Sequence, residues 1–235
     1  MNISINRNNI IFSYQTKEIN LLKALFDIKS NQEQSLTFRA GCRSGVCGCC
    51  AVRVNGEEKL ACKTFIKEND LIEPLNNSVV IKDLVVDVSH ETSLLKKSIT
   101  SIDSNKVIIS DKNALKIDIQ SNCILCNSCY SSCPVYKVNK EFIGPFALTR
   151  ALRYINDEKL EDKNIIIEKI QTDGIWDCTL CSSCTFVCPQ NIDSKSDIQM
   201  LQNISVQYGY ENPKISSGFE MSFEDEFSSF NPNSF

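Results

Sequence analysis

The sequence predicts an α+β fold in which a sheet-containing N-terminal domain precedes an all-helical C-terminal domain. In the first third of the chain, apolar and polar residues alternate over short stretches, and the Asn55-Gly56 pair favours a tight hairpin turn. Further on, apolar residues recur at helical spacing around two nearly identical cysteine runs. We expect a sheet domain over residues 1–92, a bridging helix and linker over 93–113, a helical domain over 114–209 and a tail over 210–235.

The composition indicates a metal-binding protein. The chain has 235 residues, enough for two domains that each bury a core, and its 13 cysteines are clustered, which favours metal binding over a disulfide framework. The residues after Met1 do not resemble a signal peptide, and no apolar run approaches the about 18 residues of a membrane span. The net charge is −4 without a clustered basic surface, which argues against nucleic-acid binding. We expect a cytoplasmic protein that reaches the inner face of the cell membrane only through partner subunits.

The elements of the N-terminal domain follow from local patterns. Leu21, Leu22, Leu25 and Ile28 recur at helical spacing within 20–29, and Asn20 is suited to cap that helix. The pattern predicts strands over 2–5, 10–14 and 51–54, a strand that ends at Leu60-Ala61-Cys62, and closing strands over 71–74 and 79–82.

A glycine-rich loop before the 51–54 strand carries the first cysteine group. Its C-x4-C-x2-C spacing is that of plant-type [2Fe–2S] ferredoxins, with a distant fourth cysteine, and the ligands would be Cys42, Cys47, Cys50 and Cys62. Gly41, Gly45 and Gly48 allow the close backbone approach that such a loop needs. Cys49 could compete with Cys50, but the spacing favours Cys50, and we expect Cys49 to be a small buried thiol. A β-grasp, ferredoxin-like domain is therefore predicted.

The C-terminal half predicts helices on either side of each cysteine run. We expect a bridging helix over 93–102, then a linker with a short strand over 107–109. Pro145 suits the first turn of a helix that continues to Ile155. Further helices are expected over 164–170 and from 194 to about 206.

Each of the two runs has the form C-x2-C-x2-C-x3-C-P. They span Cys123 to Pro134 and Cys178 to Pro189, and the form is that of bacterial two-cluster ferredoxins. In such a run, three thiolates hold one [4Fe–4S] cube and the fourth reaches across to the other cube. Structural zinc is the alternative, since C-x2-C pairs also bind zinc, but zinc does not require a shared fourth cysteine followed by proline.

The order of the clusters predicts electron transfer without substrate chemistry on this chain. A [2Fe–2S] domain followed by two cubes would form a series of one-electron centres. No G-x-G-x-x-G follows a strand, and His90, the single histidine, has no partners for acid–base catalysis. We therefore expect no catalytic residues here. The tail carries Phe219, Phe223, Phe227 and Phe230, which would share one face of a helix; disorder in isolation is the alternative that we favour.

From its first strand to about residue 205, the chain resembles the iron–sulfur subunit of succinate dehydrogenase or fumarate reductase. The matching stretches are Cys42-Arg43-x-Gly45-x-Cys47-Gly48-x-Cys50, Leu60-Ala61-Cys62, Lys82-Asp83-Leu84-Val85-Val86-Asp87, Cys123-Ile124-Leu125-Cys126 and Phe142-Ile143-Gly144-Pro145. The resemblance implies a subunit of an enzyme complex in which a flavoprotein with covalent FAD interconverts succinate and fumarate. It also implies a membrane partner where quinone reacts.

The resemblance also implies how the thiols are shared. The [2Fe–2S] centre, with Cys42, Cys47, Cys50 and Cys62, would lie nearest the flavin, and a [4Fe–4S] centre would be held by Cys123, Cys126, Cys129 and Cys188. In most of the family the third centre is [3Fe–4S], because the position of Cys181 is not cysteine. Here we expect a second [4Fe–4S] cube, held by Cys133, Cys178, Cys181 and Cys184.

A second departure concerns the quinone pocket. The family often has tryptophan shortly after the first Cys-Pro and histidine after the first cysteine of the second run, where this chain has Tyr136-Lys137-Val138 and Thr179. This favours the less common complexes whose membrane-side partner carries Cys-Cys-Gly motifs, so that quinone is reached indirectly. The alternatives are a subunit of another flavoenzyme, such as a glycolate-oxidase-like enzyme or a thiol-linked fumarate reductase, and a free ferredoxin carrier.

Overall fold

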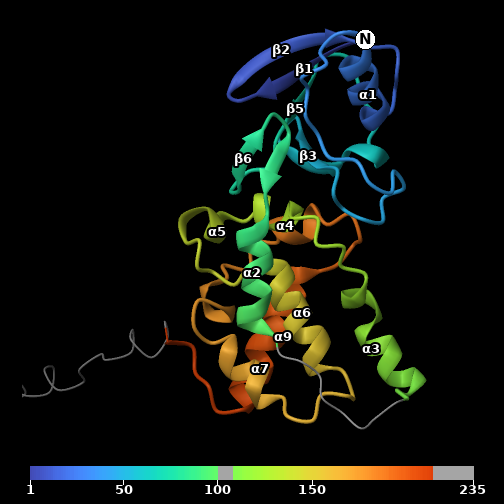
Figure 1. Ribbon diagram of the computed structural model, residues 1–235. Helices are drawn as coiled ribbons and strands as arrows, with labels where there is room; N and C mark the ends of the chain where they lie inside the picture. The colour runs from blue at the N-terminus through green and yellow to red at the C-terminus, as the bar shows by residue number, and fades with distance from the viewer. Residues whose placement is uncertain (100–107, 214–235) are drawn as a thin grey trace, which may run out of the picture.

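A computed structural model describes residues 1–99 and 108–213, and its two parts are stacked end to end (Figure 1). The N-terminal part contains the sheet, and the C-terminal part contains most of the helices. The expectation for the tail Phe residues lies outside the described residues. Among the residues described, no helix is long and apolar enough to cross a membrane.

The N-terminal part is built on a five-stranded mixed sheet in the order β2-β1-β5-β3-β4. β1 and β5 are parallel, and the other neighbours are antiparallel. Two-residue turns with positive φ join the hairpins, at Asn8-Asn9 and at Asn55-Gly56, as tight hairpins require. The strands are β1 (Asn2–Arg7), β2 (Ile10–Gln15), β3 (Ala51–Val54), β4 (Glu57–Leu60) and β5 (Asp70–Glu73).

Helix α1 (Leu21–Asn31) completes the core of this part. The side chain of Asn20 accepts a hydrogen bond from the Lys23 N–H at 3.2 Å, so Asn20 is the N-cap, as predicted. The helix buries Leu21, Leu25 and Ile28 in the same core as Ile3 and Ile5 of β1. A mixed sheet with one helix packed on it gives the predicted α+β class.

The predicted strand over 79–82 is present with those bounds, but it does not close the main sheet. β6 (Val79–Lys82) pairs only with β7 (Val85–Asp87), in a separate two-stranded sheet. The buried turn residue Asp83 anchors this hairpin: its carboxylate contacts Arg7 Nε at 3.0 Å and accepts from the Thr37 N–H at 2.8 Å. This side-chain anchor takes the place of pairing with the main sheet. Alternating apolar residues predict a strand, but they do not show which strand it pairs with.

In the C-terminal part, α6 (Pro145–Ile155) packs on α9 (Ser194–Gln207), and α2 (Ser89–Ser98), α3 (Asp111–Ser121) and α7 (Asn164–Lys169) surround them (Figure 1). The core includes Phe146, Leu148 and Leu152 from α6 and Ile198 and Leu201 from α9. Short helices contain or flank the cysteines: η1 (Ala61–Lys63), α4 (Ser128–Ser131), α5 (Pro134–Val138), η2 (Ile175–Asp177) and α8 (Ser183–Phe186).

Two expectations for the middle of the chain need correction. The bridging helix begins at Ser89 rather than 93 and ends at Ser98, because Asp87 accepts from the Ser89 N–H at 2.9 Å and starts the first turn. Residues 111–121 form a helix that was not predicted as such, and Ile108 and Ile109 lie outside any strand. This helix buries only Asn113 and Ile117, so its apolar pattern is too weak to be recognised.

Polar side chains join the two parts across their interface. Asn77, with a left-handed backbone, donates through Nδ2 to the carbonyls of Tyr130 and Ser131, both at 2.9 Å. Buried Glu58 accepts from the Ser131 hydroxyl at 2.7 Å. These contacts end on α4, the short helix that contains Cys129 of the first run.

Candidate metal centres

Two pockets in the C-terminal part are each lined by four thiols. The first is lined by Cys123, Cys126, Cys129 and Cys188, so three thiols come from the first run and one from the end of the second. The second is lined by Cys133, Cys178, Cys181 and Cys184, so one thiol comes from the first run and three come from the second. Both sets are those expected from the sequence, and four soft donors around one pocket suit an iron–sulfur cube.

The two runs have the same local backbone. Leu125 and Asn127 have φ values of 52° and 69°, and the matching Leu180 and Ser182 have 54° and 67°. A left-handed conformation costs a non-glycine residue about 1–3 kcal/mol, and it recurs where function requires it. Here the two left-handed residues turn each loop so that cysteines three positions apart line one pocket.

Cys181 occupies the place in the second run that Cys126 occupies in the first. Each precedes a left-handed residue, and each sulfur lies 3.4 Å from the hydroxyl of the serine two residues later, Ser128 or Ser183. Burial raises the pKa of Cys181, but hydrogen bonds from Ser183 and Thr179 outweigh it and lower that pKa below its ordinary value. The fourth thiol of the second pocket is therefore positioned like Cys126, its counterpart in the first pocket.

Of the other thiols in these pockets, Cys133 and Cys184 are buried and the rest are half-buried. Burial, followed by the neighbouring thiols Cys178, Cys133 and Cys181, raises the pKa of Cys184 to about 12. Burial also raises the pKa of Cys129 well above its ordinary value. Because a buried thiolate needs a cation beside it, four such groups in one pocket are compatible when they bind a metal centre.

Backbone N–H groups point at the sulfurs of both runs. Tyr136 N–H donates to Cys133 Sγ, Leu180 N–H to Cys178 Sγ and Ile192 N–H to Cys188 Sγ, each at 3.4 Å. Such N–H···S bonds stabilise the negative charge of a ligated sulfur and fix its direction.

The N-terminal loop presents its own thiols in the same way. The Ser44 hydroxyl and the N–H groups of Ser44, Val46 and Cys47 donate to Cys42 Sγ, which lowers the pKa of Cys42 to about 5. Cys47 Sγ in turn accepts from the Cys42 N–H at 3.4 Å. This loop is therefore shaped to hold thiolates near the surface of the chain.

The other two thiols predicted for this centre, Cys50 and Cys62, lie deeper. Burial raises the pKa of Cys50 to about 12, with Cys62 beside it, and the Ala61 N–H donates to the Cys50 carbonyl at 3.0 Å. Cys49 is half-buried with its sulfur 3.3 Å from Cys47 Sγ, so it is not the enclosed thiol that we expected. Burial and then Cys47 raise the pKa of Cys49 to about 11.

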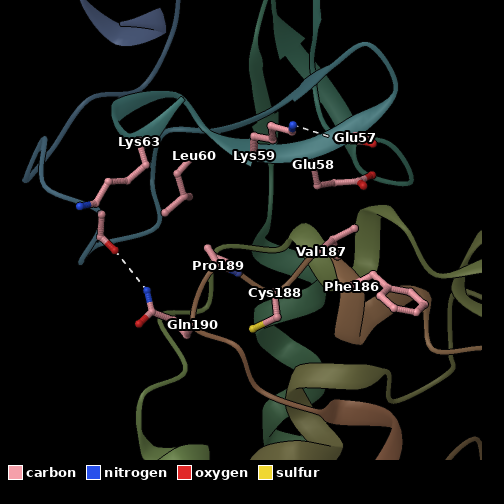
Figure 2. A pocket seen from close by; sticks show the side chains of 11 residues that line it. Glu57, Glu58, Lys59, Leu60, Lys63, Phe186, Val187, Cys188, Pro189 and Gln190 are labelled. Atoms are coloured by element: carbon pink, nitrogen blue, oxygen red, sulfur yellow. Dashed lines mark hydrogen bonds and ion pairs between the residues drawn. The ribbon is translucent and has the colours of Figure 1, made fainter. Parts of the chain in front are cut away.

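The N-terminal loop meets the first cysteine run directly. Gly48 has φ +71°, and a Cβ added to it would stand 2.7 Å from the Cβ of Cys126. Nearby, Gln190 Nε2 donates to the Gly45 carbonyl at 3.2 Å, and Figure 2 labels the Gln190 side chain that makes this bond. Gln190 follows Cys188-Pro189, so both contacts join cysteine-bearing segments of different domains.

Several residues near the centres were not predicted from the sequence. Arg150 of α6 donates to the Cys123 carbonyl at 2.8 Å and brings a positive charge to the first pocket. The only sequence signal for Gln190 is that it is a polar residue directly after Cys188-Pro189. His90 is exposed, with Nε2 2.8 Å from the Lys140 carbonyl, and it lines neither thiol pocket.

Comparisons with known proteins agree with this arrangement. Residues 6–93 match a family described as a 2Fe-2S iron-sulfur cluster binding domain, and residues 119–192 match a 4Fe-4S dicluster domain. The solved Sdh1 complex of Mycobacterium smegmatis in the apo form contains a chain of the same fold, with a TM-score of 0.80 and 21% identity over 89% of this chain and 97% of that chain.

Similar sequences come from several organisms. The fumarate reductase iron-sulfur subunit of Escherichia coli O6:H1 is 36% identical over 76% of this chain and 78% of that protein. The 8-methylmenaquinol:fumarate reductase iron-sulfur subunit of Wolinella succinogenes is 34% identical over 80% of this chain and 65% of its own length. A mitochondrial succinate dehydrogenase [ubiquinone] iron-sulfur subunit of Oryza sativa is 32% identical over 80% of this chain and 71% of its own length. The chain belongs to the family of fumarate reductase and succinate dehydrogenase iron–sulfur subunits.

Proposed function

We propose that this chain passes single electrons between the FAD of a flavoprotein subunit, where succinate and fumarate are interconverted, and a quinone-linked subunit on the membrane side. The observation that carries the proposal is the contiguous order of three cysteine groups. The N-terminal loop touches the first four-thiol pocket at Cys126, and the two pockets share both cysteine runs. Membership of the family supports the substrate pair.

Each residue set has a defined part in this proposal. Cys42, Cys47, Cys50 and Cys62 would hold a [2Fe–2S] cluster, and the two pockets would hold one cube each. Bound clusters supply one-electron acceptance and release. The chain itself fixes the cluster positions, excludes water from the buried sulfurs and directs N–H groups toward them. Arg150 adds a positive charge that favours the reduced state of the first cube.

We propose that the third centre is a [4Fe–4S] cube with Cys181 as its fourth ligand. The equivalence of Cys181 and Cys126 in backbone conformation and serine contact supports this. A single missing thiolate would leave a three-iron cluster instead.

The membrane-side partner that fits best is one of the Cys-Cys-Gly type. Val138 is 85% exposed at the end of α5, whose first residues, Pro134 and Val135, line the second pocket together with Thr179. Neither Val138 nor Thr179 offers the imidazole or indole hydrogen bond that quinone sites use in the resembling family. We therefore propose that quinone reacts on the partner, and that this chain lies at the inner face of the cell membrane through its partners.

The test is purification of the complex under anaerobic conditions through a tag on this chain. The proposal expects a co-purifying flavoprotein, succinate–dye reductase activity and about ten irons per chain from one [2Fe–2S] and two [4Fe–4S] clusters. A free ferredoxin carrier would yield the iron without a flavoprotein. A flavoprotein that oxidises glycolate or thiols but not succinate would establish the second alternative and overturn the substrate assignment.

A further inference from the structure

We propose that Ser44, Ser128 and Ser183 are positioning residues whose hydroxyls hydrogen-bond one ligand sulfur in each of the three centres and raise the reduction potential of that centre. The inference rests on the proposed function, because it assumes that the thiols bind clusters. It goes further in assigning three side chains that are not themselves ligands.

The three serines belong to one repeated local structure. Each lies two residues after a cysteine, in Cys42-Arg43-Ser44, Cys126-Asn127-Ser128 and Cys181-Ser182-Ser183. In every case the middle residue is left-handed: φ is 59° at Arg43, 69° at Asn127 and 67° at Ser182. These backbones arise in unrelated parts of the chain, since the first segment belongs to the sheet domain and the other two to the helical domain.

The left-handed residue turns the serine back toward the preceding sulfur. The Ser44 N–H reaches Cys42 Sγ at 3.4 Å, and the Ser44 side chain is the largest contributor to the lowered pKa of Cys42. The Ser128 hydroxyl lies 3.4 Å from Cys126 Sγ, and the Ser183 hydroxyl lies 3.4 Å from Cys181 Sγ. These separations are within the range for a hydrogen bond to sulfur.

Ligation decides the direction of each bond. A cysteine sulfur bound to iron carries no proton, so it can only accept, and the serine must donate. Such a bond stabilises negative charge on the cluster, and the reduced cluster carries one negative charge more than the oxidised one. The bond therefore favours reduction.

Burial makes Ser128 the strongest case. Only 1% of Ser128 is exposed, so little water is available to replace its hydroxyl. Ser183 is half-buried and Ser44 is exposed. We expect the effect of losing the hydroxyl to decrease in the order Ser128, Ser183, Ser44, because water can substitute for an exposed donor.

The test is potentiometric titration of the purified complex, followed by EPR, with the variants Ser44→Ala, Ser128→Ala and Ser183→Ala. Each variant is expected to lower the midpoint potential of its own centre and to leave the other two unchanged. Ser128→Thr and Ser183→Thr, which keep the hydroxyl, should restore the parent potentials. Ser132→Ala is the matched control, because the Ser132 hydroxyl donates to the Cys129 carbonyl at 3.3 Å and not to a sulfur.

Iron and sulfide content separate the possible failures. A variant that retains all its iron but shows an unchanged potential would overturn the role of its serine. Equal shifts at all centres, or a shift in Ser132→Ala as large as in Ser128→Ala, would also overturn it. A parent complex without clusters would instead overturn the proposed function, and a three-iron third centre would remove both Cys181 as a ligand and Ser183 as a donor to it.

Discussion

At the scale of single residues, Cys181 decides the composition of the third centre. Replacing it with serine should convert a four-iron cube into a three-iron cluster, because the fourth iron loses its thiolate. Iron should fall from about ten to about nine atoms per chain, and an oxidised [3Fe–4S] EPR signal should appear. Cys49→Ser is the matched control and should keep the full iron content. A Cys181→Ser complex with all its iron and no three-iron signal would contradict the assignment.

Two carboxylates of α9 should respond oppositely to pH. Burial raises the pKa of Asp197, although Gln120 and Thr149 donate to it, so its charged form destabilises the folded chain above that pKa. As pH falls from about 7 to about 4, protonation relieves this cost, and the parent should gain stability relative to Asp197→Asn.

Ser196 lowers the pKa of Asp193, so the stability advantage of the parent over Asp193→Asn should persist as pH falls to the ordinary pKa of an aspartate and shrink only below it. Thermal unfolding of the parent, Asp197→Asn and Asp193→Asn between about pH 7 and pH 4 checks both predictions. A stability difference between the parent and Asp197→Asn that does not change with pH would refute the prediction for Asp197.

At the scale of elements, Asn77 joins the sheet domain to α4. Its Nδ2 donates to the Tyr130 and Ser131 carbonyls, which end that short helix. Asn77→Gly keeps the left-handed backbone but removes these bonds, and it should lower the free energy of unfolding by about 1–3 kcal/mol. Asn69→Gly is the control, since Asn69 is exposed and has a similar φ of 65°. If denaturant unfolding showed the same loss of unfolding free energy in Asn77→Gly and Asn69→Gly, the hydrogen bonds of Asn77 would not contribute to stability.

The same scale shows what the sequence can and cannot predict. The Asn20 cap, the Asn55-Gly56 turn and the helix from Pro145 to Ile155 are local signals, and all three agree with the structure. The separation of β6 and β7 from the main sheet was not predicted, since this hairpin depends on Asp83 meeting Arg7, 76 residues away. Helix α3 was not predicted because it buries only one apolar residue. The grouping of the thiols was predictable from cysteine spacing. The serine contacts were not, because they depend on left-handed residues that no composition rule identifies.

At the scale of the whole molecule, Gly48 governs how closely the two domains approach. A Cβ at this position would collide with Cys126, so Gly48→Ala should push the N-terminal loop away from the first pocket. Reduction of the cubes through the [2Fe–2S] centre should become several-fold slower, while the iron content remains unchanged. Rapid-freeze EPR after mixing with a reductant measures this. Gly56→Ala is the control, because it has a similar φ of +86° but its nearest neighbour is 3.6 Å away; equal rates in both variants would contradict the prediction.

The exchange of thiols between the two runs has a consequence for the synthesis of the chain. Cys188 lines the first pocket and Cys133 lines the second, so neither pocket is complete until the last cysteine-bearing segment has been made. A chain interrupted before residue 178 would offer three thiols in one pocket and one in the other. Iron delivery therefore has to follow translation of nearly the whole helical domain, and premature termination would leave exposed thiols for quality-control proteases to detect.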